Sequence, residues 1–200
     1  EFLLTDAQAA EKYALSDPRA ASIYARRTLE LSLKWLYKND SALRAPYQKS
    51  LAAMIHEPTF SQAIKKGLFF DIKFIHKLGN VAAHSDQRIS SQEGVKAIQA
   101  LHQFLGWLAR VYTRGGAKPD EFNLGLIPKF GSQMSQQQLA KVQLVLKAKD
   151  EKTAAAEAKL SQTEEELEKL KSVLAAIQEV KQENVKTIKA DEYSEAKTRE

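Results

Sequence analysis

Residues 77–84 read Lys-Leu-Gly-Asn-Val-Ala-Ala-His and directly follow the run from Phe69 to His76. On a helix with about 100° per residue, the polar residues of this region form one stripe and the small and apolar residues form the opposite face. The polar stripe comprises Lys73, Lys77, Asn80 and His84, and the other face comprises Ile72, Ile75, Gly79, Ala82 and Ala83. Gly inside a helix costs about 1 kcal/mol relative to Ala. Gly79 therefore predicts that another helix approaches closely at this point.

Two helices are predicted ahead of this central helix. The first spans about residues 3–15. Asp17 can cap the second helix and Pro18 suits its first position, so the second helix is predicted from Pro18 to Lys38. Its predicted buried stripe comprises Ala25, Leu29, Ser32, Leu33 and Leu36. Shorter amphipathic pieces around Leu51 and Phe60 connect it to the central helix.

Another long helix is predicted after the central one. Ser90 and Glu93 have the spacing of a capping box, and Gly115 with Gly116 is typical of a helix end. The predicted inner face of this helix comprises Val95, Ile98, His102, Leu105, Ala109 and Tyr112. Because no segment alternates as a strand does, residues 1–114 are predicted to form an all-α bundle.

Residues 115–132 read as a linker with several Pro and Gly residues. The linker also carries large apolar residues, namely Phe122, Leu124, Leu126, Ile127 and Phe130. A fully solvated linker does not need such side chains. We therefore expect this arm to lie against the bundle or against a partner.

Residues 133–190 are predicted to form a long helix or coiled coil, because Pro and Gly are absent from Gln136 to Ile188. The heptad a positions are Leu139, Leu146, Thr153, Leu160, Leu167, Leu174, Lys181 and Ile188, and the d positions are Val142, Lys149, Ala156, Thr163, Leu170, Ile177 and Asn184. Lys149, Thr163, Lys181 and Asn184 interrupt the apolar pattern. A solvated single helix held by pairs such as Glu165 with Lys169 is the alternative.

Charge is uneven along the chain. Up to Phe130 there are 18 Lys and Arg against 12 Asp and Glu, and from Gly131 onward there are 12 against 13. A basic first part permits contact with nucleic acid. The chain has no cysteine, which excludes disulfides and suits a reducing compartment. No apolar run reaches the roughly 18 residues that indicate a membrane span, so no membrane partner is expected.

Few residue patterns point to chemistry. The four histidines, His56, His76, His84 and His102, lack zinc-binding spacing, and no Gly-rich phosphate loop occurs. We therefore expect no metal and no cofactor in these 200 residues. The candidates for contact with nucleic acid or a partner are the basic residues Arg26, Arg27, Lys73 and Lys77.

The pairing of Arg26-Arg27-x-Leu-Glu with residues 77–84 resembles the uncharacterised helical domain that precedes type I restriction endonuclease R (motor) subunits. That domain is in turn similar to HEPN bundles. The other matching segments are Ser16-Asp17-Pro18-Arg19-x-Ala21, Tyr24-Ala-Arg-Arg27, Trp35-Leu-Tyr37, residues 51–58, Leu105-x-Trp-Leu-Ala109 and Leu126-Ile-Pro128. Finally, Tyr193-Ser-Glu195-Ala-x-Thr-Arg199 looks like the opening of the R subunit's nuclease domain, so residues 191–200 are expected to begin that domain.

The resemblance implies a parent protein that translocates and cuts DNA with ATP and Mg²⁺. Its partners would be methyltransferase and specificity subunits, and its location would be the cytoplasm. The nuclease and motor residues would lie beyond Glu200. We therefore expect a fragment that is not itself an enzyme and that mediates contacts with subunits or DNA.

Two alternatives remain open. Many HEPN proteins are metal-independent ribonucleases, whose motif is Arg, a polar residue, three variable residues and His. Asn80 and His84 match the polar residue and the His, whereas Gly79 stands where the Arg belongs and Lys77 is the nearest cation. In that chemistry the His is an acid or base and the Arg stabilises phosphate charge. The other alternative is a dimerisation module built on the coiled coil.

Overall fold

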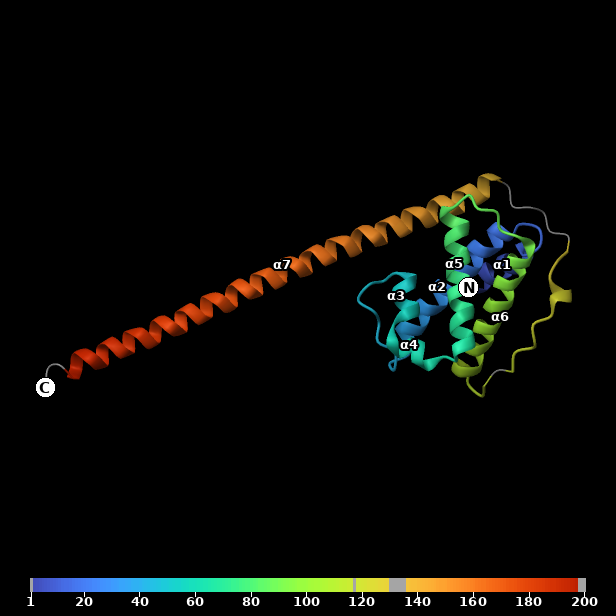
Figure 1. Ribbon diagram of the computed structural model, residues 1–200. Coiled ribbons are helices and arrows are strands. Elements are labelled where there is room, and N and C mark those ends of the chain that lie inside the picture. Colours follow the sequence, from blue (N-terminus) through green and yellow to red (C-terminus); the bar gives the residue numbers. More distant parts are fainter. Residues whose placement is uncertain (1, 117, 130–135, 198–200) are drawn as a thin grey trace. The chain divides into compact units, whose positions relative to one another are not determined.

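The structure is a computed structural model that describes residues 2–116, 118–129 and 136–197. Its helices are α1 (Phe2–Tyr13), α2 (Pro18–Asn39), α3 (Leu51–His56), α4 (Pro58–Ala63), α5 (Lys66–His84), α6 (Ser91–Tyr112), the 3-10 turn η1 (Leu124–Leu126) and α7 (Gln136–Lys197) (Figure 1). No strand occurs among the described residues. The all-α prediction is confirmed. The chain divides into two compact units, Glu1–Thr153 and Ala154–Glu200, which we describe separately.

The predicted capping residues begin the helices to which they were assigned. The Asp17 side chain accepts a hydrogen bond from the Ala20 backbone N–H at 3.0 Å, and Pro18 is the first residue of α2. Ser90 and Glu93 form a complete capping box at the start of α6. These side chains satisfy backbone N–H groups that have no partner within the helix. As a result, the long helices begin close to their predicted positions.

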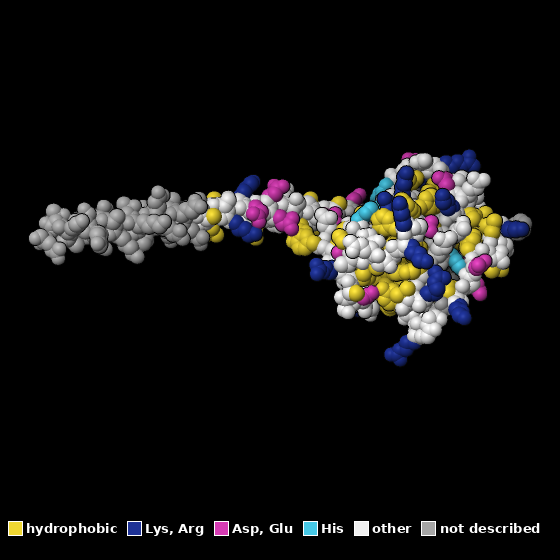
Figure 2. Space-filling model, turned by 60° about the horizontal axis from the view of Figure 1, so that its bottom comes forward, with side chains coloured by type: hydrophobic (Ala, Val, Ile, Leu, Met, Phe, Trp, Pro, Cys, Tyr) yellow, Lys and Arg dark blue, Asp and Glu magenta, His cyan; other side chains and the backbone are white. Residues whose placement is uncertain are grey.

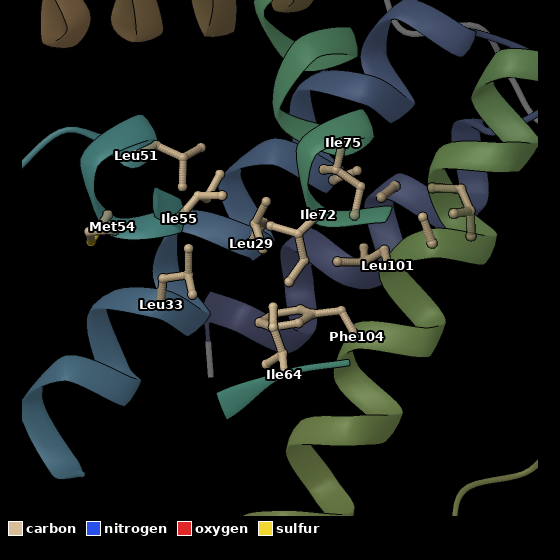
Figure 3. Packing of buried hydrophobic residues seen from close by; sticks show 14 of the residues in the cluster. Leu29, Leu33, Leu51, Met54, Ile55, Ile64, Ile72, Ile75, Leu101 and Phe104 are labelled. Carbon is tan, nitrogen blue, oxygen red and sulfur yellow. The ribbon is translucent and has the colours of Figure 1, made fainter. Parts of the chain in front are cut away.

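The core of the first unit lies where α2, α5 and α6 pack around one another, with α3 covering one side (Figure 3). The core side chains labelled there include Leu29 and Leu33 of α2, Ile72 and Ile75 of α5, and Leu101 and Phe104 of α6. The predicted buried stripe of α2 is confirmed at every position. Burying side chains of this size contributes roughly 1.5–3 kcal/mol each, so this cluster stabilises the bundle.

Helices α2 and α5 cross at Gly79. A Cβ atom placed on Gly79 would lie only 2.5 Å from the Cβ and 2.7 Å from the Cδ of Arg26. The Arg26 side chain therefore runs over Gly79, a position of α5 that has no side chain of its own. The predicted close approach is confirmed, and all the residues of the predicted small and apolar face of α5 are buried.

The first part of α7 belongs to the first unit. Leu146 is 3% exposed and packs with Ile23, Leu78 and other buried residues of the bundle. Leu139 and Val142 pack against the same cluster, and the Gln143 side chain donates a hydrogen bond to the Ala82 carbonyl at 2.9 Å. The boundary between the units thus falls inside α7, after Thr153, whereas sequence patterns suggest a break at the linker.

The arm between α6 and α7 passes along the bundle (Figure 1). Ile127 is 3% exposed and joins the core, and the Phe122 ring lies 5.7 Å from that of His102. Leu124 and Leu126 are 56% and 72% exposed. The expectation that the arm lies against the bundle holds for two of its apolar side chains, while Phe130 lies outside the described residues.

In the second unit α7 continues as helix to Lys197. Its apolar heptad residues Leu167, Leu170, Leu174 and Ile177 are between 48% and 65% exposed. The side chains of Lys181, Asn184, Ile188 and the Tyr193 to Arg199 segment lie outside the described set. Within the described part of the chain, no helix combines the length and the apolar character that a membrane crossing requires.

Candidate functional site

The Arg26 guanidinium is the central charge of the candidate site. Its side chain is 5% exposed, and Nη2 donates to both carboxylate oxygens of Asp150 at 2.9 Å. Its Nε and Nη1 atoms are buried and have no hydrogen-bond partner in the described part of the structure. A buried cation is costly unless an anion compensates it. Asp150, which comes from α7, supplies that anion.

His84 contacts the same carboxylate. It is the last residue of α5, and its Nε2 lies 2.8 Å from Oδ2 of Asp150. Asp150 thus sits between a guanidinium of α2 and an imidazole of α5. The contact therefore joins α2, α5 and α7 at one point.

A second ion pair lies one turn further along α2. Glu30 is 5% exposed and accepts a hydrogen bond from Lys34 at 2.7 Å and another from Lys149 of α7. Burial acts to raise the pKa of the Glu30 carboxyl, but the hydrogen bonds from Lys149 and Lys34 outweigh it and hold that pKa below its ordinary value. Glu30 is therefore a carboxylate at neutral pH, matched to the Lys149 ammonium.

The two ion pairs between α2 and α7, Arg26 with Asp150 and Glu30 with Lys149, follow from the spacing of these residues along their helices. Arg26 and Glu30 are four residues apart on α2, so they face the same side of the helix. Lys149 and Asp150 are neighbours on α7 and carry the opposite charges. This arrangement fixes the register of α7 on α2, because a shift of one turn along either helix would separate Arg26 from Asp150 and Glu30 from Lys149, leaving Arg26 without its anion and Glu30 with Lys34 alone.

Asn80 faces a different partner. Its Nδ2 lies 3.2 Å from Nε2 of His76, one turn back on α5. Burial lowers the pKa of His76, and the nearby charges of Arg26 and His56 lower it further, while Asp150 acts in the opposite direction. A neutral imidazole can accept the amide hydrogen bond from Asn80. The pair lies near enough to Arg26 for the guanidinium charge to act on His76.

The remaining predicted contact residues lie around this site. Arg27 forms an ion pair of 3.4 Å with the buried Asp6 and lies over the Tyr24 ring. Lys73 lies over the Phe69 ring at 5.5 Å, and Lys77 is exposed. The structure thus joins Arg26 to His84 through Asp150 and leaves Lys73 and Lys77 on the surface.

Sequence reasoning missed Lys149 and Asp150 as site residues. The available signal was Lys149 itself, because a charged residue at a heptad d position is unfavourable in a coiled coil and indicates a different environment. Its buried partner, Glu30, stands between Leu29 and Leu33 in α2, and an acidic residue among such apolar neighbours also indicates a paired charge.

The described residues of the first unit line hollows on either side of the bundle's long helices. A cavity of about 350 Å³ lies between α2 and α7, lined by Arg27, Glu30, Lys141, Val142, Leu146 and other residues. A larger cleft of about 890 Å³ lies between α5, α6 and the arm, with Leu68, His102, Trp107, Arg110 and Phe122 among its lining residues. Among the described residues, no group of three or more His, Cys, Asp or Glu side chains is arranged to hold a metal ion.

These features define an all-α bundle domain whose buried charges bind the first turns of a long helix. The model of the family described as "Domain of unknown function (DUF4145)" matches residues 8–136. The chain belongs to this family. Neither the curated proteins nor the solved structures gave a match. The family match ends at the first residue of α7, so Lys149 and Asp150 lie beyond it.

Proposed function

We propose that this chain is the N-terminal accessory region of a type I restriction endonuclease R subunit, in which the bundle anchors a long spacer helix and contacts other subunits or DNA. The order of motifs along the sequence supports the parent's identity. The observation that carries the anchoring role is the pairing of Arg26 and His84 with Asp150. The parent would work in the cytoplasm with ATP, Mg²⁺, and methyltransferase and specificity subunits.

The same pairing argues against catalysis by this region. A general acid or base must reach the substrate proton it transfers. The Nε2 atom of His84 is engaged by Asp150, and Nη2 of Arg26 is engaged by the same carboxylate. In this arrangement the residues stabilise the α7 contact, and bond cleavage is left to the nuclease and motor regions of the parent.

The basic surface of the bundle is the proposed contact face. Lys and Arg side chains are spread between apolar patches over the face of the bundle in Figure 2. Lys73 and Lys77 lie one turn apart on the exposed side of α5. Such charges attract an acidic partner surface or the DNA backbone, and salt weakens that attraction.

Calorimetry of the chain with the cognate methyltransferase–specificity complex, with and without DNA, tests the proposal. We expect binding by the wild type and at least a roughly tenfold loss for Lys73→Glu with Lys77→Glu, since about 1.4 kcal/mol corresponds to that factor. The control is Lys38→Glu with Lys49→Glu, which changes the net charge equally at other exposed positions. Failure of the wild-type chain to bind either partner would contradict the contact role.

A HEPN-type ribonuclease is the second candidate, and one observation favours it. The aliphatic part of the Arg26 side chain runs across Gly79. Helix α2 therefore brings a cation close to the position at which the HEPN motif has its Arg. Asp150 would then have to leave before RNA could bind. Labelled RNA incubated with wild type and with Asp150→Ala separates the candidates. The anchoring role predicts no cleavage by either protein, and cleavage abolished by His84→Ala would favour the enzyme.

A further inference from the structure

The second unit carries an apolar seam, by which we mean Leu160, Leu167, Leu170, Leu174 and Ile177. The last four of these side chains are each about half exposed or more, from 48% to 65%. Their spacing alternates by three and four residues, except at Thr163. An apolar stripe at this spacing buries itself against a helix with the same repeat.

We propose that the seam pairs with the seam of a second copy of this chain, parallel and in register, as a two-stranded coiled coil. The inference is independent of the proposed role in a restriction enzyme. It rests on the charges that flank the seam and not on its apolar content alone. With Leu160, Leu167 and Leu174 at a positions, the g positions hold Lys159 and Glu166 and the e positions hold Glu164 and Lys171.

These charges are complementary between identical parallel helices. In a parallel pair, each g residue faces the e residue of the following heptad on the other helix. Lys159 then faces Glu164 of the second copy, and Glu166 faces Lys171 of the second copy. Each contact occurs twice by symmetry, so four opposite-charge pairs flank the seam. All four residues are exposed in the single chain.

An antiparallel pair fits these charges less well. In the antiparallel arrangement that sets Leu167 against Leu170 of the second copy, g residues face g residues. Glu166 then faces Val173 and loses its cationic partner. The flanking charges therefore favour the parallel direction. The apolar seam covers fewer heptads than the three or four of a long coiled coil, so we expect a reversible, concentration-dependent dimer.

Disulfide trapping in the full chain tests direction and register. The chain has no cysteine, so a single introduced thiol reports on its own position. We expect Leu170→Cys to form a covalent dimer under mild oxidation at least about ten times faster than Glu165→Cys, which lies at the outward f position, because a disulfide requires Cα atoms within about 7 Å. Equal rates, or faster linkage of Leu167→Cys to Leu170→Cys than of Leu170→Cys to itself, would overturn the proposal.

Charge reversal provides an independent test by sedimentation equilibrium. Glu166→Lys places like charges together twice in a parallel dimer, and we expect about a tenfold weaker association. Adding Lys171→Glu to the same chain should restore wild-type association. Circular dichroism confirms that each variant keeps its helix. A helical wild-type chain that stays monomeric at every concentration tested, or a double variant as weak as the single one, would overturn the proposal.

Discussion

At the scale of single residues, Gly79 determines how α2 and α5 cross. The predicted effect of Gly79→Ala is destabilisation, because the new Cβ would lie 2.5 Å from the Arg26 Cβ, which is close to the α2 backbone and cannot swing away. Overpacking of this kind costs about 1–3 kcal/mol and exceeds the helix-propensity gain of up to about 1 kcal/mol. Urea unfolding of the wild type and of Gly79→Ala measures the difference in their free energies of unfolding.

The control for this substitution lies in the same helix. A Cβ on Gly67 meets nothing within 4 Å, so Gly67→Ala should leave stability unchanged or raise it by up to about 1 kcal/mol. Equal stability of the two Ala variants would show that the contact between Arg26 and Gly79 does not constrain the crossing.

The lowered pKa of His76 predicts how the free energy of unfolding depends on pH. Its pKa in the folded state is lowered from the ordinary 6.5, first by burial and then by the charges of Arg26 and His56. Protonation therefore favours the unfolded state, so the contribution of His76 is fully present above pH 6.5 and is lost as pH falls through the lowered pKa. The wild type should lose more unfolding free energy between about pH 7.5 and about pH 5.5 than His76→Gln does. Identical pH dependence of the two proteins would contradict this assignment.

Single residues also show what sequence patterns can predict about the site. Gly79 stands out because Gly is unfavourable inside a helix, and His84 stands out because it can hydrogen-bond or carry charge; Gly79 lies at the helix crossing and His84 at the ion pair. Asp150 could not be found in this way, because one more Asp in a charged helix carries no distinguishing pattern. Its role depends on a contact across 124 residues, which only the fold reveals.

At the scale of helices, Leu146 is buried more deeply than Leu139 and Val142, the other α7 side chains that pack against the same apolar cluster of the bundle. Leu146→Ala should destabilise the first unit by about 2–4 kcal/mol, because Leu146 is 3% exposed and its loss leaves a cavity. Leu144→Ala is the matched control in the same helix, at 68% exposure, and should change stability by less than about 0.5 kcal/mol. Thermal unfolding compares the two, and a Leu146 variant as stable as the control would argue against a docked α7.

Helix periodicity predicts which face is apolar but not what covers it. Leu139, Val142 and Leu146 fit the heptad pattern of the rest of α7, yet they pack against the bundle. In α6 the predicted inner face is only partly right, because Ile98 is buried while Val95 and Tyr112 are half-buried. The more deeply buried line runs through Ala97, Leu101 and Phe104, where α6 fits between its neighbours α2 and α5.

At the scale of the whole molecule, the family match ends before the first unit does, and the buried ion pairs extend beyond the match. The DUF4145 match covers the bundle and the arm and ends at residue 136. The cation and the anion that complete the buried site, Lys149 and Asp150, lie beyond it. The bundle thus presents a buried Arg26 and Glu30 to whatever helix follows, and in this chain α7 supplies their partners.

The paired charges around Arg26 hold the start of α7 on the bundle. Amide hydrogen exchange across residues 139–150 in Asp150→Asn and in the neighbouring control Glu151→Gln tests it most directly. Asp150→Asn removes the anion that compensates the Arg26 guanidinium, whose side chain is only 5% exposed. The backbone amides of residues 139–150 in this variant should therefore exchange at least about tenfold faster than those of the wild type. Glu151→Gln, at an exposed position, should exchange as the wild type does. Equal protection in all three proteins would contradict the claim.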